Sequence, residues 1–324
     1  MLNKELTRRQ AALALGLALG GGLVARAQAA EKLRIGAVLY ARDSQFWQQI
    51  ERGMQDAAAK YGAVIQFVLN HRQLATESQV LDDLTTRGID VLIVSPIDKN
   101  ASAAAIRRVV GQGALSIEYN TFLADTSISA HAVGVDNTEL AALVGRALRD
   151  DVNRTLGGKV TLGLITLPLI NPGSAIRKAG FLAALDGVTY TIVAETAAAT
   201  PEQGANALET ILERDPATQM VWCSSAGSIE GAAASARRAG VKVRLFGIDM
   251  SQALAENMLD PTGNVAAVSD QQPYQVGYLA VETAVKAKQG AQMPRDVQVP
   301  PKLYSRQEPQ GLHDYLNLLK SLQG

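Results

Sequence analysis

Hydrophobic and polar positions alternate regularly along most of the chain. The apolar run 33–39 predicts a first strand. Trp47 and Ile50 open a series of apolar residues spaced three and four apart, which predicts one face of a helix. Further apolar runs predict strands at 64–69, 91–94 and 115–119. Between these strands we expect helices capped by Thr76 and Asn100, whose side chains can accept hydrogen bonds from a helix start.

The same alternation restarts after Asp136. Predicted helices cover 138–150, 174–186, 202–214 and 228–239. Predicted strands follow them at 160–166, 190–194, 220–224 and 245–249. Strict alternation of strands and helices is typical of parallel sheets covered by helices on both faces. Two such runs in succession predict an α/β fold with two similar, Rossmann-like lobes.

The first 30 residues have the pattern of an export signal. A basic start at 4–9 precedes an apolar run, rich in Gly and Ala, at 11–24, and small residues follow at 27–29. The pair Arg8-Arg9 resembles a twin-arginine signal. A membrane anchor is the alternative, but the apolar run is shorter than the roughly 20 residues that span a bilayer. We therefore expect a cleaved signal peptide at 1–30 and a periplasmic protein.

Charge, cysteine content and missing motifs narrow the function classes. Residues 31–324 carry 27 basic and 30 acidic side chains, a net charge of −3, so we expect no nucleic acid partner. Cys223 is the single cysteine, which excludes an internal disulfide, and its apolar neighbours predict that it is buried. His71, His131 and His313 do not stand at metal-ligand spacing. Because phosphate-loop, dinucleotide, nucleophile-elbow and zinc-protease motifs are also missing, we predict no metal, no cofactor and no enzyme activity.

The alternating pattern also predicts where a ligand binds. In open parallel sheets, ligands bind beyond the carboxyl ends of the strands. The segments at those ends are 40–47, 95–98, 119–121, 166–177, 224–227, 249 and 270–273. We expect the binding site to be assembled from them.

Short motifs at these strand ends have the order and spacing of one protein family. They are Phe46-Trp47, Ser95-Pro96, Arg177-Lys178-Ala179-Gly180-Phe181, Gly247-Ile248-Asp249, and Gln271-Gln272-Pro273 followed by Gly277. Through them the chain resembles the type I periplasmic sugar-binding proteins, the ribose- and galactose-binding group, over about residues 33–307. The resemblance implies a non-catalytic substrate-binding protein of an ABC transporter.

The resemblance also implies how the lobes are built. The N-terminal lobe would hold residues 31–135 plus 272–300, and the C-terminal lobe 136–271 plus 301–324, with three chain crossings as a hinge. A ligand that binds the closed form more tightly shifts the protein toward that form. The closed protein, which we expect to be a monomer, would deliver its ligand to a membrane ABC permease. A periplasmic sensing subunit for a chemoreceptor or a histidine kinase is the alternative.

Five side chains in the family's motifs have a physical role in sugar binding. Phe46 and Trp47 can cover the C–H faces of a sugar ring. Arg177 offers forked donors to two adjacent hydroxyls. Asp249 accepts hydroxyl protons, and Gln271 both donates and accepts. Trp47 also fits the core stripe of its helix, and Asp249 could instead cap the helix that follows it.

The sequence departs from the sugar-binding pattern at two strand ends. Tyr119-Asn120 stands where ribose and galactose binders carry Asp-Arg, and Ser225 stands where they carry Asn. These less charged groups are compatible with a neutral polyol, a cyclitol, a deoxy or modified sugar, or a furanone-type signal. Further candidate ligand contacts are Tyr40, Tyr119, Asn120, Asn171 and Ser225.

Residues 308–324 continue beyond the region of resemblance. Apolar positions there predict a short amphipathic helix, and they are Leu312, Tyr315, Leu316, Leu319 and Leu322. We expect this helix to pack on the C-terminal lobe, with docking to a partner as the alternative.

Overall fold

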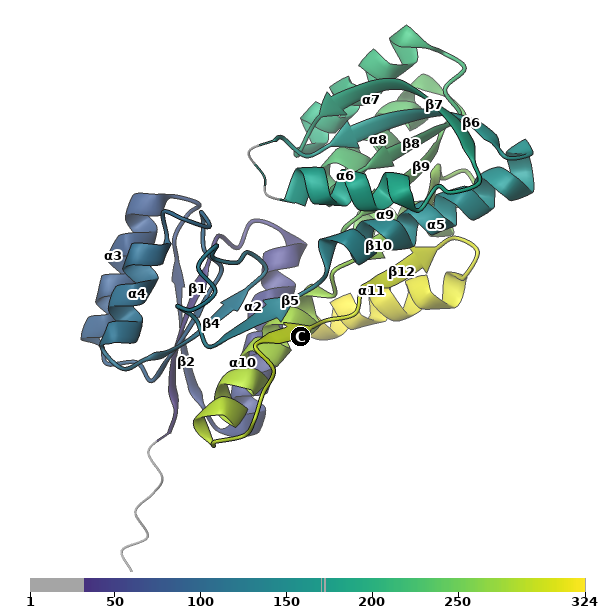
Figure 1. Cartoon of the computed structure of the whole chain (residues 1–324). Helices are drawn as coiled ribbons and strands as arrows, with labels where there is room; N and C mark the ends of the chain where they lie inside the picture. The colour runs from purple at the N-terminus through teal and green to yellow at the C-terminus, as the bar shows by residue number, and fades with distance from the viewer. Residues whose placement is uncertain (1–31, 170, 172, 324) are drawn as a thin grey trace, which may run out of the picture. The chain divides into compact units, whose positions relative to one another are not determined.

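The computed structural model describes residues 32–169, 171 and 173–323. These residues form two sheets of six strands each, with helices packed against them (Figure 1). The predicted α/β fold with two Rossmann-like sheets is confirmed. The predicted signal peptide at 1–30 lies outside the described residues. Over the ranges that the structure describes, no helix is both long enough and apolar enough to cross a membrane.

The first sheet collects strands from the first half of the chain and one strand from near its end. Its strands are β1 (Arg34–Leu39), β2 (Val64–Leu69), β3 (Val91–Val94), β4 (Leu115–Tyr119), β5 (His131–Gly134) and β11 (Asp296–Gln298). They lie in the order β11-β5-β4-β3-β1-β2, and each neighbouring pair is parallel. Its helices are α2 (Gln45–Tyr61), α3 (Leu74–Thr86), α4 (Ala103–Gly111) and α10 (Pro273–Lys288). The sequence pattern did not predict β5 and β11, because their sequences, HAVG and DVQ, hold no run of three or more apolar residues.

Side chains of β1 enter two different cores, because successive residues of a strand point to opposite faces of the sheet. Ile35 and Leu39 pack with α2 and α10, whereas Val38 packs with α3 and α4. The helices α2 and α10 approach closely at Gly53, where a Cβ atom would lie 2.1 Å from the carbonyl oxygen of Tyr274. A glycine at this position therefore determines how near α10 lies to α2.

The second sheet is built from the middle of the chain and completed by a strand from near its end. Its strands are β6 (Lys159–Thr166), β7 (Thr189–Ala197), β8 (Met220–Cys223), β9 (Arg244–Ile248), β10 (Val265–Asp270) and β12 (Lys302–Ser305). They lie in the order β12-β10-β9-β8-β6-β7; β12 is antiparallel to β10, and the other pairs are parallel. Its helices are α5 (Asn137–Leu156), α6 (Gly173–Ala183), α7 (Pro201–Arg214), α8 (Ala226–Ala239), α9 (Gln252–Leu259) and α11 (Pro309–Gln323).

The second sheet has apolar cores on both faces. On one face Phe181 of α6 stacks on Trp222 of β8, with ring centroids 4.4 Å apart and an interplanar angle of 11°. Cys223 is completely buried, as predicted, and burial raises the pKa of its thiol, which keeps it protonated and unreactive. Leu312 and Tyr315 of α11 are buried in the core on the other face. The predicted amphipathic helix is thus present, with its apolar residues packed inward.

The chain passes from one sheet to the other at three places. They are residues 135–136 between β5 and α5, 271–272 between β10 and α10, and 299–301 between β11 and β12. At the second crossing, buried Asp270 accepts hydrogen bonds of 2.9 Å from the backbone N–H groups of Met250 and Gln272. Burial raises the pKa of Asp270 to about 7.

Two predicted helix starts are wrong. The helix α3 begins at Leu74, before Thr76, and α4 begins at Ala103, after Asn100. In the second case Asp98 supplies the acceptor, because its Oδ1 takes hydrogen bonds from the N–H groups of Asn100 and the next residue at 2.8 and 2.7 Å. Because the Asp98 side chain bonds these backbone N–H groups, the chain forms a turn at this point and α4 begins only after it.

Candidate functional site

A cavity of about 570 Å³ lies at the carboxyl ends of strands from both sheets. Its lining includes six of the ten predicted contact residues, which are Tyr40, Trp47, Asn120, Asn171, Arg177 and Gln271. A volume of this size suits a ligand as large as a monosaccharide.

A second compartment, of about 790 Å³, shares Arg72 with this cavity. Phe46, Ser225 and Asp249 line the second compartment. Nine of the ten predicted contact residues therefore line two adjoining compartments, which together we call the cleft. In the part of the chain that the structure describes, no cluster of His, Cys, Asp and Glu could hold a metal ion.

Arg177 and Asp249 form the polar centre of the cleft. Arg177 Nη1 lies 3.5 Å from Asp249 Oδ2, and Gln271 Nε2 donates a hydrogen bond of 2.6 Å to Asp249 Oδ1. Arg177 Nε also donates to Asn137 Oδ1 at 2.8 Å, and Nη1 donates to the carbonyl oxygen of Ser224 at 2.9 Å. Arg177 and Gln271 are only 8% and 7% exposed. The group is therefore preorganised, with its orientation fixed by protein partners before any ligand arrives.

The backbone presents Asp249 and Asn120 in an unusual conformation. Their φ angles are 69° and 61°, directly after β9 and β4. Left-handed conformations of residues other than glycine cost energy and cluster at functional sites. The alternative role of Asp249 as a helix cap is excluded, because Ser251 holds the N-cap position of α9 and its Oγ accepts from Leu254 N–H at 3.4 Å.

Tyr40, Phe46 and Trp47 form an aromatic wall on the first-sheet side of the cleft. The Trp47 ring centroid lies 4.7 Å from that of Tyr40 and 5.1 Å from that of Phe46. Trp47 is 7% exposed and packs in the core while it also lines the cavity, so both roles that the sequence allowed are compatible. The Tyr40 hydroxyl donates to the carbonyl oxygen of Pro96 at 2.6 Å, and burial raises the pKa of Tyr40. This bond fixes the wall to the turn that follows β3.

Tyr119 does not reach the cleft, so this predicted ligand contact is wrong. Its side chain is completely buried, and its hydroxyl donates to the carbonyl oxygen of Val38 at 2.7 Å. Its ring packs edge to face beneath Trp47, with centroids 6.4 Å apart and an interplanar angle of 73°. Tyr119 therefore supports the aromatic wall from the core.

Ser225 and Asn171 each have a structural role near a helix start. Ser225 holds the N-cap position of α8, where its Oγ accepts from Ser228 N–H at 3.5 Å. Asn171 Oδ1 accepts from Gly173 N–H at 2.8 Å. Both side chains also line the cleft, and ligand contact by either one stays a prediction.

Among the residues that line the cavity but were not predicted as contacts are Arg72, Lys99 and Asn137. Arg72 and Lys99 stand a few residues beyond the ends of β2 and β3, outside the strand-end segments that the sequence singled out. Asn137 is the first residue of α5, and nothing in the sequence indicated that it holds Arg177.

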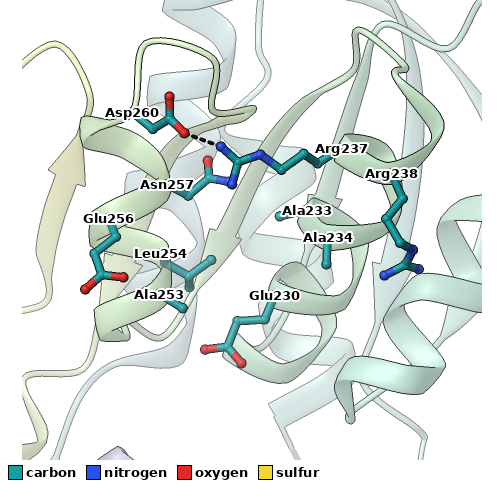
Figure 2. Close-up of a pocket in the computed structure, with 10 residues that line it drawn as sticks. All are labelled: Glu230, Ala233, Ala234, Arg237, Arg238, Ala253, Leu254, Glu256, Asn257 and Asp260. Atoms are coloured by element: carbon teal, nitrogen blue, oxygen red, sulfur yellow. Dashed lines mark hydrogen bonds and ion pairs between the residues drawn. The ribbon is translucent and has the colours of Figure 1, made fainter.

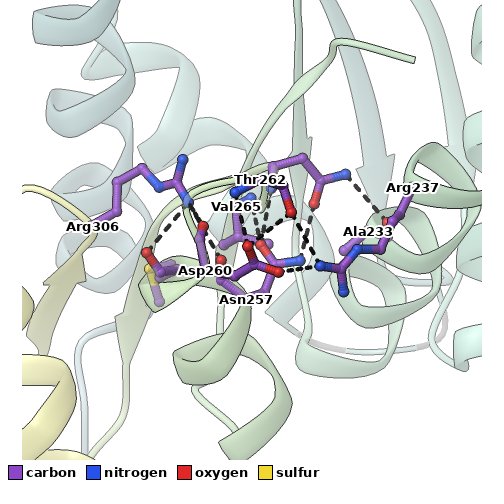
Figure 3. Close-up of polar contacts among 9 residues, drawn as sticks. Ala233, Arg237, Asn257, Asp260, Thr262, Val265 and Arg306 are labelled. Atoms are coloured by element: carbon purple, nitrogen blue, oxygen red, sulfur yellow. Dashed lines mark hydrogen bonds and ion pairs between the residues drawn. The ribbon is translucent and has the colours of Figure 1, made fainter. Parts of the chain in front are cut away.

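A groove of about 470 Å³ between α8 and α9 is a different kind of surface (Figure 2). Side chains of both charges line it, and Arg237 pairs with Asp260 there. Figure 3 shows the hydrogen bonds around it: Asn257 Oδ1 accepts from Val265 N–H at 2.9 Å, and Arg306 donates to the carbonyl oxygen of Asp260 at 2.8 Å. These bonds tie the end of α9 to β10 and to the residue after β12, so we interpret the network as structural.

Comparison with known sequences gives the family. Residues 35–292 match the model of the periplasmic binding protein domain family. The chain is 27% identical over 308 residues to the ABC transporter periplasmic-binding protein YphF of Escherichia coli strain K12. This match covers 91% of this chain and 92% of that protein. The chain is also 26% identical over 303 residues to the ribose import binding protein RbsB of Haemophilus influenzae. This match covers 91% of this chain and 99% of that protein.

Solved structures agree in fold. The glucose-galactose binding protein GanP from Geobacillus stearothermophilus superposes with a TM-score of 0.75 at 23% identity, over 86% of this chain and 99% of that one. The binding protein of the arabinose ABC transporter from Shewanella sp. ANA-3 gives a TM-score of 0.80 at 15% identity, over 90% and 98%. Because the family model matches most of the chain, the protein belongs to the periplasmic binding protein domain family.

Proposed function

We propose that this protein captures a small polyhydroxy ligand in the periplasm by closing two lobes around it, and delivers the ligand unchanged to a membrane ABC importer. The observation that carries the proposal is the polar centre, in which buried Arg177 and Gln271 contact half-buried Asp249. It offers forked donors, a carboxylate acceptor and an amide within one hydrogen-bonded group.

This polar centre favours a ligand rich in hydroxyl groups. Each hydroxyl both donates and accepts, so adjacent hydroxyls can bond Arg177 and Asp249 at the same time. After closure, a ligand without hydroxyls would leave the hydrogen-bonding positions of these groups that face the ligand without partners, at a cost of about 1–3 kcal/mol for each unpaired group. Selectivity for polyhydroxy compounds follows from that cost.

The aromatic wall supplies the apolar half of the recognition. Phe46 and Trp47 lie edge to face, at an interplanar angle of 83°, so the pair offers both a ring face and a ring edge. The C–H groups of a sugar ring fit against such a surface and exclude water from the polar centre. Tyr40 extends this surface within the cavity lining.

Lobe closure requires connections that bend, and we assign this role to the three crossings at 135–136, 271–272 and 299–301. The N-terminal lobe then holds 31–135 plus 272–300, and the C-terminal lobe holds 136–271 plus 301–324. Because Gln271 belongs to the second crossing, a ligand bound at the polar centre acts directly on the hinge.

Import is favoured over sensing because the relatives reported above are named as transport proteins. One of them is named a periplasmic-binding protein, which supports a periplasmic location for this chain as well. We therefore expect a membrane ABC permease to be the partner of the ligand-bound form.

Isothermal titration calorimetry tests this proposal. The chain from Glu31 onward is refolded to remove carried-over ligand and titrated with pentoses, hexoses, polyols and cyclitols. We expect at least one of these compounds to bind, and Arg177→Ala and Asp249→Ala each to lose at least about a hundredfold in affinity. Arg238→Ala, which removes an exposed arginine from the groove between α8 and α9, is the matched control and should bind normally. Undiminished affinity in folded Arg177→Ala would overturn the proposal.

A further inference from the structure

The cavity at the polar centre is lined by basic side chains and by no acidic one among the described residues. Arg72, Lys99 and Arg177 line it, and they come from the loop after β2, the loop after β3 and the helix α6. The other lining residues are neutral. The cavity is therefore positively charged unless other groups balance these three side chains.

Two of the three charges are balanced by carboxylates of the adjoining compartment. Arg72 Nη1 and Nη2 donate to the two oxygens of Asp43 at 2.8 and 3.0 Å. Arg177 Nη1 lies 3.5 Å from Asp249 Oδ2. Asp43 and Asp249 line the second compartment and not this cavity. Each carboxylate therefore balances the charge of its arginine without adding a negative charge to the cavity lining.

Lys99 makes no ion pair within the described ranges of the chain. It is exposed. The neighbouring Asp98 interacts with Lys99 electrostatically, and Lys99 helps to lower its pKa, but the two side chains form no ion pair; Asp98 Oδ1 instead accepts hydrogen bonds from the backbone N–H groups of Asn100 and Ala101. Among the basic side chains that line the cavity, Lys99 is therefore the one that no carboxylate contacts directly, and it is available to a ligand.

The loop that carries Arg72 is built at an energetic cost. His71 and Arg72 have φ angles of 53° and 58°, two left-handed residues in succession. Completely buried Asn70 holds this turn, since its Oδ1 accepts from Arg72 N–H at 3.0 Å. Strain of this kind persists where the surrounding structure enforces it, commonly at ligand sites.

We propose that the ligand is a sugar acid, a polyhydroxy compound with one carboxylate that Lys99 and Arg72 bind. This rests on the proposed function, because it assumes that the hydroxyls of the same ligand occupy the polar centre. One carboxylate matches the one lining basic side chain that has no ion pair, and Arg72 adds guanidinium donors from the loop after β2. Closure of the lobes would exclude water and strengthen this interaction.

Calorimetric titrations compare each acid with its neutral parent. The probes are D-galacturonate against D-galactose, D-gluconate against D-glucose, and glucose 6-phosphate as a dianion. The variant Lys99→Gln removes the positive charge of Lys99, and Lys99→Arg restores a positive charge at this position. Lys159→Gln is the matched control, because Lys159 is an exposed lysine at the first position of β6, at the other end of that strand from the cleft.

We expect one of the acids to bind at least about tenfold more tightly than its neutral parent, and Lys99→Gln to remove most of that difference. Lys99→Arg and Lys159→Gln should keep it. Raising NaCl from about 20 to 500 mM should weaken binding of the acid and not of the neutral parent.

Three outcomes contradict the proposal in different ways. Tight binding of neutral sugars with no preference for their acids would refute the sugar-acid assignment and leave the proposed function standing. Preference for the phosphate over both carboxylates would replace the carboxylate with a phosphate group. Failure of every sugar, polyol, acid and phosphate to bind would overturn the proposed function together with this inference.

Discussion

Gln271 Nε2 lies 2.6 Å from Asp249 Oδ1, so a residue of the second crossing between the sheets donates directly to the carboxylate of the polar centre. Gln271 follows β10, whereas Asp249 follows β9, the neighbouring strand. The bond therefore couples the point where the chain changes sheet to the group that we expect to hold the ligand.

Removal of this bond should weaken ligand binding. Gln271→Leu keeps the size of the side chain and leaves Asp249 Oδ1 without its donor. A hydrogen bond to a charged group contributes about 1.5–3 kcal/mol, so we expect roughly a tenfold to hundredfold loss of affinity by calorimetry. Gln289→Leu, at the far end of α10, is the control and should bind normally. Equal affinities of the two variants would show that the bond has no part in binding.

Asn137 should act as a positioning residue for Arg177. Its Oδ1 accepts from Arg177 Nε at 2.8 Å, which fixes the plane of the guanidinium. We expect Asn137→Ala to lower ligand affinity about tenfold with little change in thermal stability, because the residue is at the edge of a cavity. Asn137→Asp keeps the acceptor and should restore affinity to within about threefold. If Asn137→Asp binds as poorly as Asn137→Ala, the acceptor is not what matters at this position.

The contact between α2 and α10 should tolerate no side chain at Gly53. A Cβ atom there would lie 2.1 Å from the carbonyl oxygen of Tyr274, and overpacking of this kind costs about 1–3 kcal/mol or more. Gly53→Ala should therefore lower the free energy of unfolding in urea by at least about 2 kcal/mol. Gly111→Ala is the matched control in α4: its Cβ meets nothing within 4 Å, so this variant should be neutral or slightly stabilised. Equal stability of the two variants would contradict the close approach.

Asp270 should make the folded state less stable as the pH rises. Burial raises its pKa to about 7 from an ordinary value of 3.8, so the folded state binds a proton that the unfolded state has released between about pH 4 and pH 7. The stability gained from this proton is present at pH 5 and lost by pH 8, a decrease of about 2–3 kcal/mol. Urea unfolding at both pH values measures it, with Asp270→Asn as the reference that removes the titration. A wild-type pH dependence identical to that of Asp270→Asn would contradict the raised pKa.

The sequence predicted the two lobes because each buried strand is a continuous apolar run and each helix has an apolar stripe. The run 91–94 is buried at each residue, and the stripe at Trp47, Ile50 and Met54 packs in the core. Periodicity does not locate helix starts, however. Asp98, and not Asn100, bonds the free N–H groups before α4, and that choice depends on how the turn folds.

The candidate site could be predicted where a residue directly follows a strand. Asp249 and Asn120 do so and line the cleft, whereas Tyr119 is the last residue of its strand and points into the core. Residues deeper in the loops could not be placed from the pattern. Arg72 reaches the cavity because His71 and Arg72 adopt the left-handed conformation and turn the chain. The residue types at these positions do not predict that conformation.

A thermal-shift screen of the chain from Glu31 onward, stripped of ligand by unfolding and refolding, tests the central claim most directly. A ligand of micromolar affinity at about 1 mM stabilises the folded state by about 4 kcal/mol. For a chain of this size each kcal/mol raises Tm by roughly 2–4 °C, so the shift should reach about 8–16 °C. We expect such a shift with a sugar, a sugar acid or a polyol, and its loss in Arg177→Ala. A flat response to all of these compounds would contradict the assignment of the cleft as a polyhydroxy-ligand site.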